Sequence, residues 1–367
     1  MKKLKILHLN SNFLFTKIYE NQINSMSNEF KHVIYNPLKS HIDNNSGLDV
    51  LHPENLNKFD SLLTLRRLSK SFRYIKRKVD LRDIDIIHAH TMSNDGLLAW
   101  KLYKKYNIPY ILTIRNTDIN FTLRYKKHLK KHFYKVLISA NIIIFPNYSY
   151  KLKLMNYYKN DVTLENKLKK AIVIPNGIDK MWINNPTNKI KYINKKKVKV
   201  LFVGRIYRNK NLHNLLEAIE KIDNCELTVI GKIIDSKYFN DLSINYNLNY
   251  IGEKNKEEIL DIMKNHHIFA MPSFNETFGL VYIEALSQNL PILYTKNEGI
   301  YNYFPEYRFG IAVNPNQVDE IRSGIEWIVN NYEKIQENLT SKAFLEEFDW
   351  NNIGKYYESI YLGGKNE

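Results

Sequence analysis

Two acidic residues that follow an apolar segment are the first candidates for chemistry in this chain of 367 residues. Glu276 lies just before a predicted helix and Glu284 lies inside it. The six residue steps from Phe278 to Glu284 rise about 9 Å along a helix, so the two carboxylates are too far apart to act as one acid–base pair. They can instead accept hydrogen bonds from hydroxyl groups at opposite ends of an extended ligand, and a vicinal diol suits a carboxylate well. The alternative is an acid that stabilises a helix N-terminus and a second acid satisfied inside the fold.

A second motif combines a glycine with two cations between a predicted strand and a predicted helix. Gly204 and Arg205 follow the strand, and Lys210 precedes the helix. A helix start offers unpaired N–H groups and the positive end of a dipole, which together bind anions. Arginine grips phosphate oxygens with a planar fork, whereas lysine acts as a point charge. The motif therefore indicates a phosphate site, and the alternative is an exposed turn with incidental bases.

Together these motifs resemble those of the family 4 retaining glycosyltransferases, which have the GT-B architecture of two Rossmann-like domains. The acid-x7-acid signature and the diphosphate loop of that family both have counterparts here. So do the strand and turn that close its first domain, and its terminal helix, which crosses back to that domain. The matching segments are Glu276…Glu284, Gly204-Arg205 with Lys210-Asn211, 173–179 (Val-Ile-Pro-Asn-Gly-Ile-Asp), and Phe348-Asp349-Trp350 followed by Tyr356, Tyr357 and Tyr361.

The resemblance implies a role for each donor-side residue. Arg205 and Lys210 would neutralise the diphosphate of a nucleotide-sugar and so stabilise the leaving group, and Glu276 would bind donor-sugar hydroxyls. These three are the expected catalytic residues, and Glu284 is expected to hold the ribose diol. The remaining expected donor-binding residues are Gly204, Phe278, Gly279, Leu280 and Asn176. The family works without a metal or cofactor, because cationic side chains and helix dipoles substitute for one, and UDP-sugars are the favoured donors.

The acceptor side departs from the family pattern. Relatives commonly have a glycine pair after the first strand, where this chain has Asn12 in the sequence Asn-Ser-Asn, and a histidine where this chain has Arg115. Arg115 is expected to bind an acceptor phosphate or carboxylate, and Asp118 to position a hydroxyl, unless they form a surface ion pair. We expect His90 to point toward the cleft mouth, and the neighbouring His88 to be packed.

The pattern along the chain predicts two doubly wound α/β domains. Continuous apolar strands that alternate with helices indicate parallel sheets covered on both faces. We expect a first domain over residues 1–183, a linker over 184–197, a second domain over 198–347, and a final helix over 348–367 that crosses back. Ligands of such domains bind at the carboxyl ends of the strands, here in a cleft between the domains. Asp83-Ile84-Asp85 leads into a buried strand and is not expected to bind a metal.

The predicted elements of the first domain are strands over 5–9, 85–89, 110–114, 141–145 and 171–174 and helices over 95–106 and 122–139. Those of the second domain are strands over 198–203, 226–230, 268–271 and 292–294 and helices over 212–222, 256–265 and 278–288.

The formal net charge of +16 is concentrated in the first half of the chain. Residues 1–185 contain 32 Lys and Arg against 14 Asp and Glu, whereas residues 186–367 contain 22 against 24. Three basic stretches that include aromatic residues dominate, at 66–82, 124–135 and 151–170. Such asymmetry indicates an anionic partner, either a nucleic acid or an anionic membrane face. The alternative is compositional, because the chain is crowded with Lys, Asn, Ile and Tyr.

Composition narrows the class of protein. The single cysteine, Cys225, excludes a disulfide framework within the chain and fits a reducing compartment. No apolar run approaches the roughly 18 residues of a spanning helix, and the start of the chain turns polar too early for a signal peptide. We therefore expect a cytoplasmic protein, peripheral at the inner face of the cell membrane.

The sequence as a whole predicts a retaining glycosyltransferase that moves a sugar from a nucleotide-sugar to a hydroxyl of a glycan. The basic first domain favours an acceptor linked to a lipid diphosphate, for surface polysaccharide. The rival hypotheses are a basic nucleic-acid-binding protein and a GT-B protein that binds a glycan without catalysis. No nucleic-acid partner is expected, because such binding gives no reason for the spacing of Glu276 and Glu284.

Overall fold

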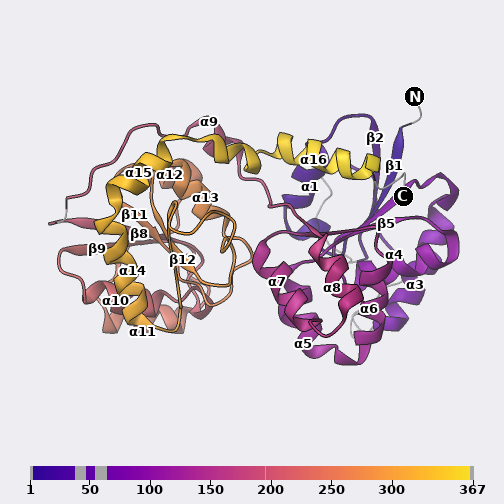
Figure 1. Ribbon diagram of the computed structural model, residues 1–367, viewed down its shortest axis with the longest axis horizontal. Coiled ribbons are helices and arrows are strands. Elements are labelled where there is room, and N and C mark those ends of the chain that lie inside the picture. Colours follow the sequence, from indigo (N-terminus) through magenta and orange to yellow (C-terminus); the bar gives the residue numbers. More distant parts are fainter. Residues whose placement is uncertain (1–2, 38–46, 54–63, 195, 364–367) are drawn as a thin grey trace. The chain divides into compact units, whose positions relative to one another are not determined.

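The computed structural model describes residues 3–37, 47–53, 64–194 and 196–363. The chain divides into two compact units (Figure 1). The first contains residues 1–146, 150–177 and 350–367, and the second contains residues 147–149 and 178–349. Each has its own parallel sheet with helices, so the prediction of two doubly wound α/β domains is confirmed.

The first unit is built on a seven-stranded sheet in the order β3-β2-β1-β4-β5-β6-β7, and every pairing in it is parallel. Its central strands are mostly apolar and buried, as a sheet covered on both faces requires, although His8 on β1 and His88 on β4 are buried with them. The strands are β1 (Leu4–Leu9), β2 (Phe30–Tyr35), β3 (Val50–Leu51), β4 (Ile86–Ala89), β5 (Tyr110–Thr113), β6 (Ile142–Phe145) and β7 (Ile172–Val173). The helices are α1 (Ile18–Asn24), α3 (Thr64–Lys78), α4 (Asn94–Tyr106), α5 (Leu123–Tyr125), α6 (Lys130–Ser139), α7 (Tyr148–Tyr157), α8 (Val162–Lys169) and α16 (Trp350–Gly363).

The second unit repeats the architecture with six parallel strands in the order β10-β9-β8-β11-β12-β13. The strands are β8 (Val198–Val203), β9 (Cys225–Ile230), β10 (Asn249–Tyr250), β11 (Ile268–Ala270), β12 (Ile292–Thr295) and β13 (Gly310–Val313). The helices are α9 (Lys180–Asn184), α10 (Leu212–Glu220), α11 (Ser236–Asn245), α12 (Lys256–Lys264), α13 (Leu280–Ser287), α14 (Val318–Asn330) and α15 (Tyr332–Thr340).

The basic helix predicted over 122–139 is broken in the structure. The chain forms a π turn over Asp118–Thr122, then α5, a 3-10 turn over Lys127–Leu129, and finally α6. The break lies at Lys126, whose φ of −108° and ψ of 41° are not helical. Lysines at 126, 127, 130 and 131 would repel one another one turn apart in a continuous helix, which disfavours it.

Residues 184–197, expected as a linker, belong to the second unit. Lys191 is mostly buried there, and its ammonium donates to the carbonyl oxygens of Met263 at 2.6 Å and His266 at 3.0 Å. The amide of Thr187 donates to the Ser287 carbonyl at 3.0 Å. The segment is hydrophilic because its polar groups bind the last carbonyl groups of α12 and α13. From sequence alone, such polar residues look the same as residues that are exposed to water.

The last helix, α16, belongs to the first unit although its residues follow the second one in the chain (Figure 1). Its buried residues recur three and four positions apart and pack against the cluster that contains Leu4 and Ile6 of β1. Gly354 permits a close approach to α1, because a Cβ at this position would overlap the carbonyl group of Ser25. Residues 364–367 of the predicted helix lie outside the described residues.

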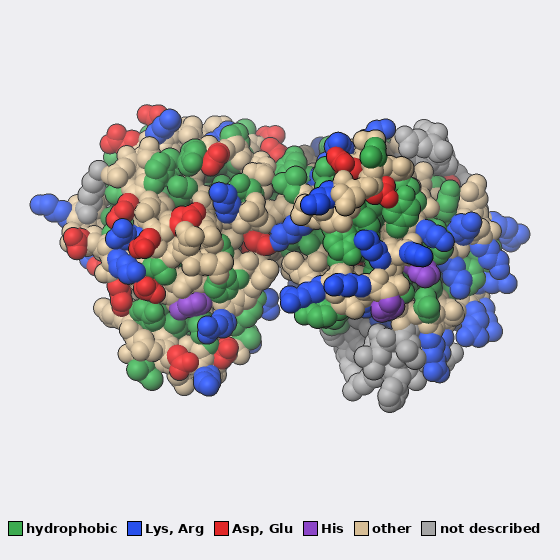
Figure 2. Space-filling model, turned by 60° about the horizontal axis from the view of Figure 1, so that its bottom comes forward, with side chains coloured by type: hydrophobic (Ala, Val, Ile, Leu, Met, Phe, Trp, Pro, Cys, Tyr) green, Lys and Arg blue, Asp and Glu red, His purple; other side chains and the backbone are tan. Residues whose placement is uncertain are grey.

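Figure 2 shows that Lys and Arg side chains gather on the first unit, whereas both signs of charge mix over the second. The basic stretch 66–82 forms most of α3, and the stretch 151–170 covers α7 and α8. Much of the surplus charge that the sequence places in its first half therefore lies on helices and turns of the first unit rather than on its strands.

We expect Gly354→Ala to lower the free energy of unfolding of the first unit by about 1–3 kcal/mol, the cost of overpacking. The control is Gly363→Ala in the same helix, where nothing lies within 4 Å of the added Cβ. Urea unfolding of the two variants measures the difference. Equal midpoints would show that the α1–α16 contact does not require glycine.

Candidate functional site

In the second unit, the order of the strands reverses at β8: the chain adds strands on one side of β8 and then on the other. The neighbours of β8 in the sheet are β9 on one side and β11 on the other. Open α/β sheets bind ligands at the carboxyl ends of the strands at such a point. The loop after β8 (204–211) and the loop after β11 (271–279) meet there, so the two motifs that the sequence singles out come together.

Hydrogen bonds join these two loops. The Phe274 amide donates to the Asn209 carbonyl at 2.9 Å, and the Asn209 side chain donates to the Asn275 carbonyl at 2.9 Å. Asn211 is fully buried, and its side-chain amide donates to the carbonyl oxygens of Pro272 at 2.9 Å and Pro315 at 2.7 Å. The position of one loop is thereby fixed relative to the other.

An ion pair between Lys210 and Glu276 lies where the loops meet. The Lys210 ammonium is 2.5 Å from Glu276 Oε2, and the two side chains are 13% and 12% exposed. Glu276 Oε1 also accepts from the Thr277 amide at 3.0 Å. A cation suited to phosphate and a carboxylate suited to hydroxyls therefore lie side by side, although they are 66 residues apart in the sequence.

Gly279 begins α13 in the left-handed conformation, with φ 78°. A Cβ here would overlap the ring of Tyr282, whose hydroxyl donates to the Met271 carbonyl at 2.5 Å. The sequence predicts this helix from residue 278, and the structure begins it at Leu280, because Gly279 turns the chain into it. The first amides of a helix have no partner within it and carry partial positive charge.

Phe278 is 1% exposed, and its ring packs against those of Tyr303 and Phe348. It is therefore available to a ligand through its backbone only. Arg205 is exposed, and its guanidinium lies 5.7 Å from the centre of the Tyr207 ring, outside the Lys210–Glu276 pair. Gly204 lies opposite Gly231, at which a Cβ would overlap the Gly204 carbonyl, so a second glycine supports the loop.

Glu284 is partly exposed on α13, and burial of its carboxyl raises its pKa to about 7. Two charged neighbours act on that pKa in opposite senses: Lys256 lowers it and Asp179 raises it. Lys256 and Asp179 also form an ion pair of 2.5 Å with each other. Lys256 could not be identified from the sequence, because nothing in the residues around it marks it as a neighbour of Glu284.

Glu298 was also missed. It follows β12, is 9% exposed, and its Oε2 accepts from the Glu276 amide at 3.3 Å. The next residue, Gly299, has φ 52° and donates its amide to the Glu276 carbonyl at 3.1 Å. The backbone of Glu276 is thus held from both sides. An acid followed by a glycine, directly after a buried strand, is a sequence pattern that could have identified Glu298 and Gly299 as contacts of the Glu276 backbone.

The corresponding point in the first unit lies between β1 and β4. Asp95, at the start of α4, accepts from the Ser11 hydroxyl at 2.6 Å and the Thr91 hydroxyl at 2.9 Å. Asn12 is partly exposed, and its amide donates to Asn10 Oδ1 at 3.0 Å. These contacts shape the loop after β1 where relatives commonly have glycines.

His90, expected to point toward the cleft mouth, is 1% exposed within the first unit. Its Nε2 is 3.0 Å from Nδ1 of His8, and its ring stacks on His88 with 4.0 Å between centres. His88 is packed as expected, with its ring nitrogens 2.7 Å from the Tyr361 hydroxyl and 2.8 Å from the Thr113 hydroxyl. Burial lowers the pKa of His88 to about 3, so its ring is neutral at physiological pH.

Among the described residues, His8, His88 and His90 are the group that could hold a metal ion by distance. Their ligand atoms lie within 4.8 Å of one another. Burial lowers the pKa values of all three, which favours the neutral form that binds metals. The hydrogen bonds among these rings and to the neighbouring hydroxyls already account for their close approach.

Asp118 and Arg115 do not form the surface ion pair considered as an alternative. Asp118 is fully buried, and its carboxylate accepts from the amides of Met92 at 2.9 Å, Ser93 at 3.2 Å and Arg115 at 3.0 Å. It therefore ties the loop after β4 to the loop after β5. Burial raises its pKa to about 6, against the effect of these hydrogen bonds.

The Arg115 side chain remains partly exposed. Its guanidinium lies 5.1 Å from the centre of the Tyr19 ring, and Nη1 donates to Asn176 Oδ1 at 3.3 Å. Asn176, expected on the donor side, thus lies in the first unit beside Arg115. Arg115, Asn176 and Tyr19 form one cluster, of which Tyr19 was missed.

In a comparison with known proteins, both halves of the chain match glycosyltransferase family models. Residues 32–181 match the family model described as Glycosyltransferase Family 4, and residues 185–345 match the model described as Glycosyl transferases group 1. An uncharacterised glycosyltransferase of Methanocaldococcus jannaschii is 27% identical over 304 residues, which is 80% of each chain. TuaC of Bacillus subtilis, a proposed teichuronic acid biosynthesis glycosyltransferase, is 24% identical over 267 residues, covering 71% of this chain and 65% of its own.

Solved structures share the fold. Anabaena HepE, in complex with UDP-glucose, superposes with a TM-score of 0.68 at 14% identity, covering 98% of this chain and 100% of its own. Within the described residues, no helix has the length and apolar character to cross a bilayer.

The buried contacts of Asn211 give a prediction for the loop junction. Asn211 has φ 55°, so Asn211→Ala loses two hydrogen bonds of about 1 kcal/mol each and strains the backbone by about 1–2 kcal/mol. We expect Asn211→Gly to be less destabilising, because glycine keeps that conformation. Urea unfolding measures both, with Asn224→Ala (exposed, φ 59°) as the control for backbone strain alone. Equal losses for Ala and Gly at 211 would contradict the backbone argument.

Proposed function

Because the chain is a family 4 glycosyltransferase with the GT-B fold, we propose that it transfers a sugar, with retention, from a UDP-sugar to a hydroxyl of a glycan. The observation that carries the donor half of this proposal is the Lys210–Glu276 pair at the carboxyl ends of β8 and β11. It places a cation for a diphosphate beside a carboxylate for sugar hydroxyls. The UDP-glucose complex of the structural neighbour HepE supports UDP as the nucleotide.

The proposed donor contacts follow from the geometry of the second unit. Lys210 and Arg205 neutralise the diphosphate, and the first amides of α13 add hydrogen bonds and the positive end of its dipole. Glu276 accepts from the donor-sugar hydroxyls. Glu284, further along α13, accepts from both ribose hydroxyls when it is ionised. The protein itself then supplies the positive charge that the leaving group needs.

In the proposed transfer, the bond between the sugar C1 and the diphosphate oxygen breaks, and its electron pair stays on the diphosphate. The acceptor hydroxyl oxygen attacks C1 from the same face, so the configuration is retained. The acceptor proton passes to the departing diphosphate oxygen. Glu276 forms no covalent intermediate in this scheme, because its role is to orient the sugar beside Lys210.

The first unit is proposed to bind an acidic acceptor at the membrane. Its surplus of positive charge suits an anionic lipid surface or a lipid-diphosphate-linked glycan, since each nearby Lys or Arg contributes about 1 kcal/mol. Arg115, beside Asn176 and Tyr19, is the proposed contact to an acceptor phosphate or carboxylate. The similarity to TuaC, named for teichuronic acid biosynthesis, supports surface polysaccharide as the product class.

Removing either member of the ion pair tests the donor site. We expect Glu276→Gln and Lys210→Met each to lower kcat/KM about 100-fold or more, as loss of a charge-stabilising group does. The measurement is UDP release from a panel of UDP-sugars in the presence of acceptor. Glu257→Gln, an exposed acid on α12, is the control and should keep wild-type activity. Undiminished transfer by Glu276→Gln would refute the assignment, and binding of glycan without any transfer would favour a non-catalytic protein.

The raised pKa of Glu284 predicts a pH dependence of donor binding. Its carboxyl, with a pKa of about 7, is mostly protonated at pH 6 and mostly ionised at pH 8. Only the ionised form accepts both ribose hydrogen bonds, so affinity for UDP-glucose should rise about tenfold between these pH values. Isothermal titration checks this, and UDP-glucose has no phosphate group that titrates in the interval. Glu284→Gln should abolish the dependence, and an unchanged pH profile in that variant would contradict the role of Glu284.

A further inference from the structure

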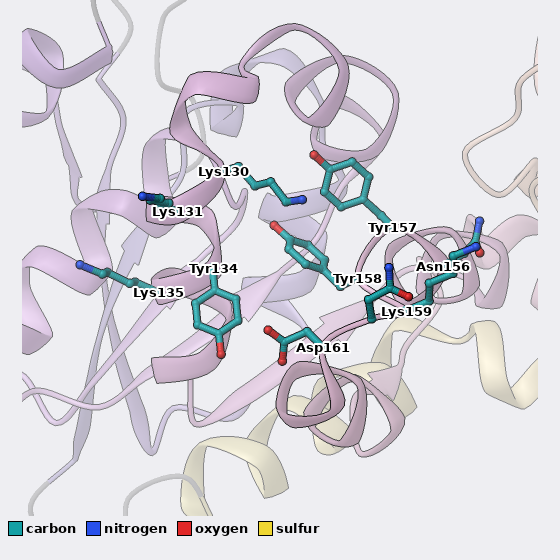
Figure 3. Close-up of a pocket in the computed structure, with 10 residues that line it drawn as sticks. Lys130, Lys131, Tyr134, Lys135, Asn156, Tyr157, Tyr158, Lys159 and Asp161 are labelled. Carbon is teal, nitrogen blue, oxygen red and sulfur yellow. The ribbon is translucent and has the colours of Figure 1, made fainter.

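A cavity of about 580 Å³ in the first unit shares no lining residue with the candidate donor and acceptor sites. It is formed by α6, the end of α7 and the turn into α8 (Figure 3). Its volume is within the range of ligand pockets, which is about 300–1,000 Å³. Two of the basic stretches recognised in the sequence, 124–135 and 151–170, supply all of its lining residues.

The lining carries a strong positive charge. Four lysines line it, three from α6 (Lys130, Lys131, Lys135) and Lys159 from the turn after α7. In Figure 3 the Lys130 ammonium points toward the tyrosine rings, whereas Lys131 and Lys135 extend away from them along the rim. Among the described residues, no ion pair neutralises any of these four lysines. The single acid in the lining, Asp161, is engaged as the cap of α8, where it accepts from the Leu164 amide at 2.9 Å.

Aromatic rings form the floor of the cavity. The Lys130 ammonium lies 5.2 Å from the centre of the Tyr157 ring and 5.8 Å from that of Tyr158. The two tyrosine rings pack edge to face with 4.9 Å between centres, and Tyr134 lines the same cavity. Tyr157 is 37% exposed, so its ring is accessible to a ligand.

Tyr158 provides an independent sign of a ligand. Its side chain is only 6% exposed, and its hydroxyl is buried without a hydrogen-bond partner. A buried hydroxyl left unpaired costs about 1–3 kcal/mol, and such groups in native proteins call for a partner. Burial also raises the pKa of this phenol, so it stays protonated and can donate. A ligand oxygen in the cavity would satisfy it.

We propose that this cavity binds an acidic saccharide, as a second glycan site in addition to the acceptor position. The lysines pair with its carboxylate or phosphate, the tyrosine rings stack on the apolar face of a sugar ring, and Tyr158 donates to a ring or hydroxyl oxygen. A cavity of this volume admits roughly one or two sugar units, which a flat bilayer surface does not provide. The inference rests on the proposed function, because it names the charge of the glycan that the enzyme extends.

The test is the affinity of the full chain for trigalacturonate, measured by isothermal titration without donor. We expect the double variant Lys130→Ala/Lys159→Ala to weaken binding at least tenfold and Tyr158→Phe about threefold. The matched control, Lys76→Ala/Lys104→Ala, removes the same charge from exposed positions on α3 and α4 and should change the affinity less than twofold. Maltotriose and inorganic phosphate should each bind far more weakly than trigalacturonate.

Four results would overturn the proposal. The first is that trigalacturonate does not bind, and the second is that the pocket variant and the control variant lose affinity equally. The third is that inorganic phosphate binds as tightly as trigalacturonate. The fourth is that the pocket variants bind anionic vesicles more weakly while their affinity for trigalacturonate is unchanged. Thermal stabilisation by UDP-sugars, followed in parallel, reports the donor site in the other unit. Its absence would count against the proposed function and not against the cavity.

Discussion

In the second unit, the ion pair between Lys210 and Glu276 joins two loops that the fold brings to one edge of the sheet. Two largely buried charges are stable there because each compensates the other, and because backbone contacts to Glu276 hold its position. Removing one partner would leave the other uncompensated. A bound diphosphate could replace Glu276 as the partner of Lys210 and release the carboxylate toward sugar hydroxyls. The loops after β8 and β11, with Gly279 at the start of α13, all lie at this edge of the sheet.

The two halves of the chain differ in net charge. The second half of the chain is almost neutral, and its few effective cations lie on the loop after β8, where a diphosphate would need them. The first half carries the surplus, and part of it lines a cavity with tyrosines. The surplus positive charge of the chain therefore lies in the unit that is proposed to bind the acceptor, and not in the unit that is proposed to bind the donor.

Much of the fold could be predicted from sequence, as could the two loops that meet at the candidate donor site, because these depend on local patterns. Apolar runs locate the central strands, and glycine, cations and acids at fixed spacing identify the two donor loops. The acceptor side could not be predicted, because the contacts of Asp118 and His90 are made with groups that only the folded chain brings close. Asp118 accepts from backbone amides, and His90 lies against His8 and His88. Asparagine also misleads a pattern search for glycine: Asn211 and Asn289 adopt left-handed conformations with φ 55° and 57°.

The most direct test of the central claim is a double-mutant cycle of Lys210→Met and Glu276→Gln on sugar transfer from UDP-sugar. If the two residues act as one unit on the donor, the double variant is no worse than the poorer single variant, and the coupling free energy exceeds about 1.4 kcal/mol, a factor of ten in rate. Multiplicative losses, with no coupling, would show that the pair does not act as one unit on the donor. Full activity in all three variants would place the chemistry elsewhere in the chain.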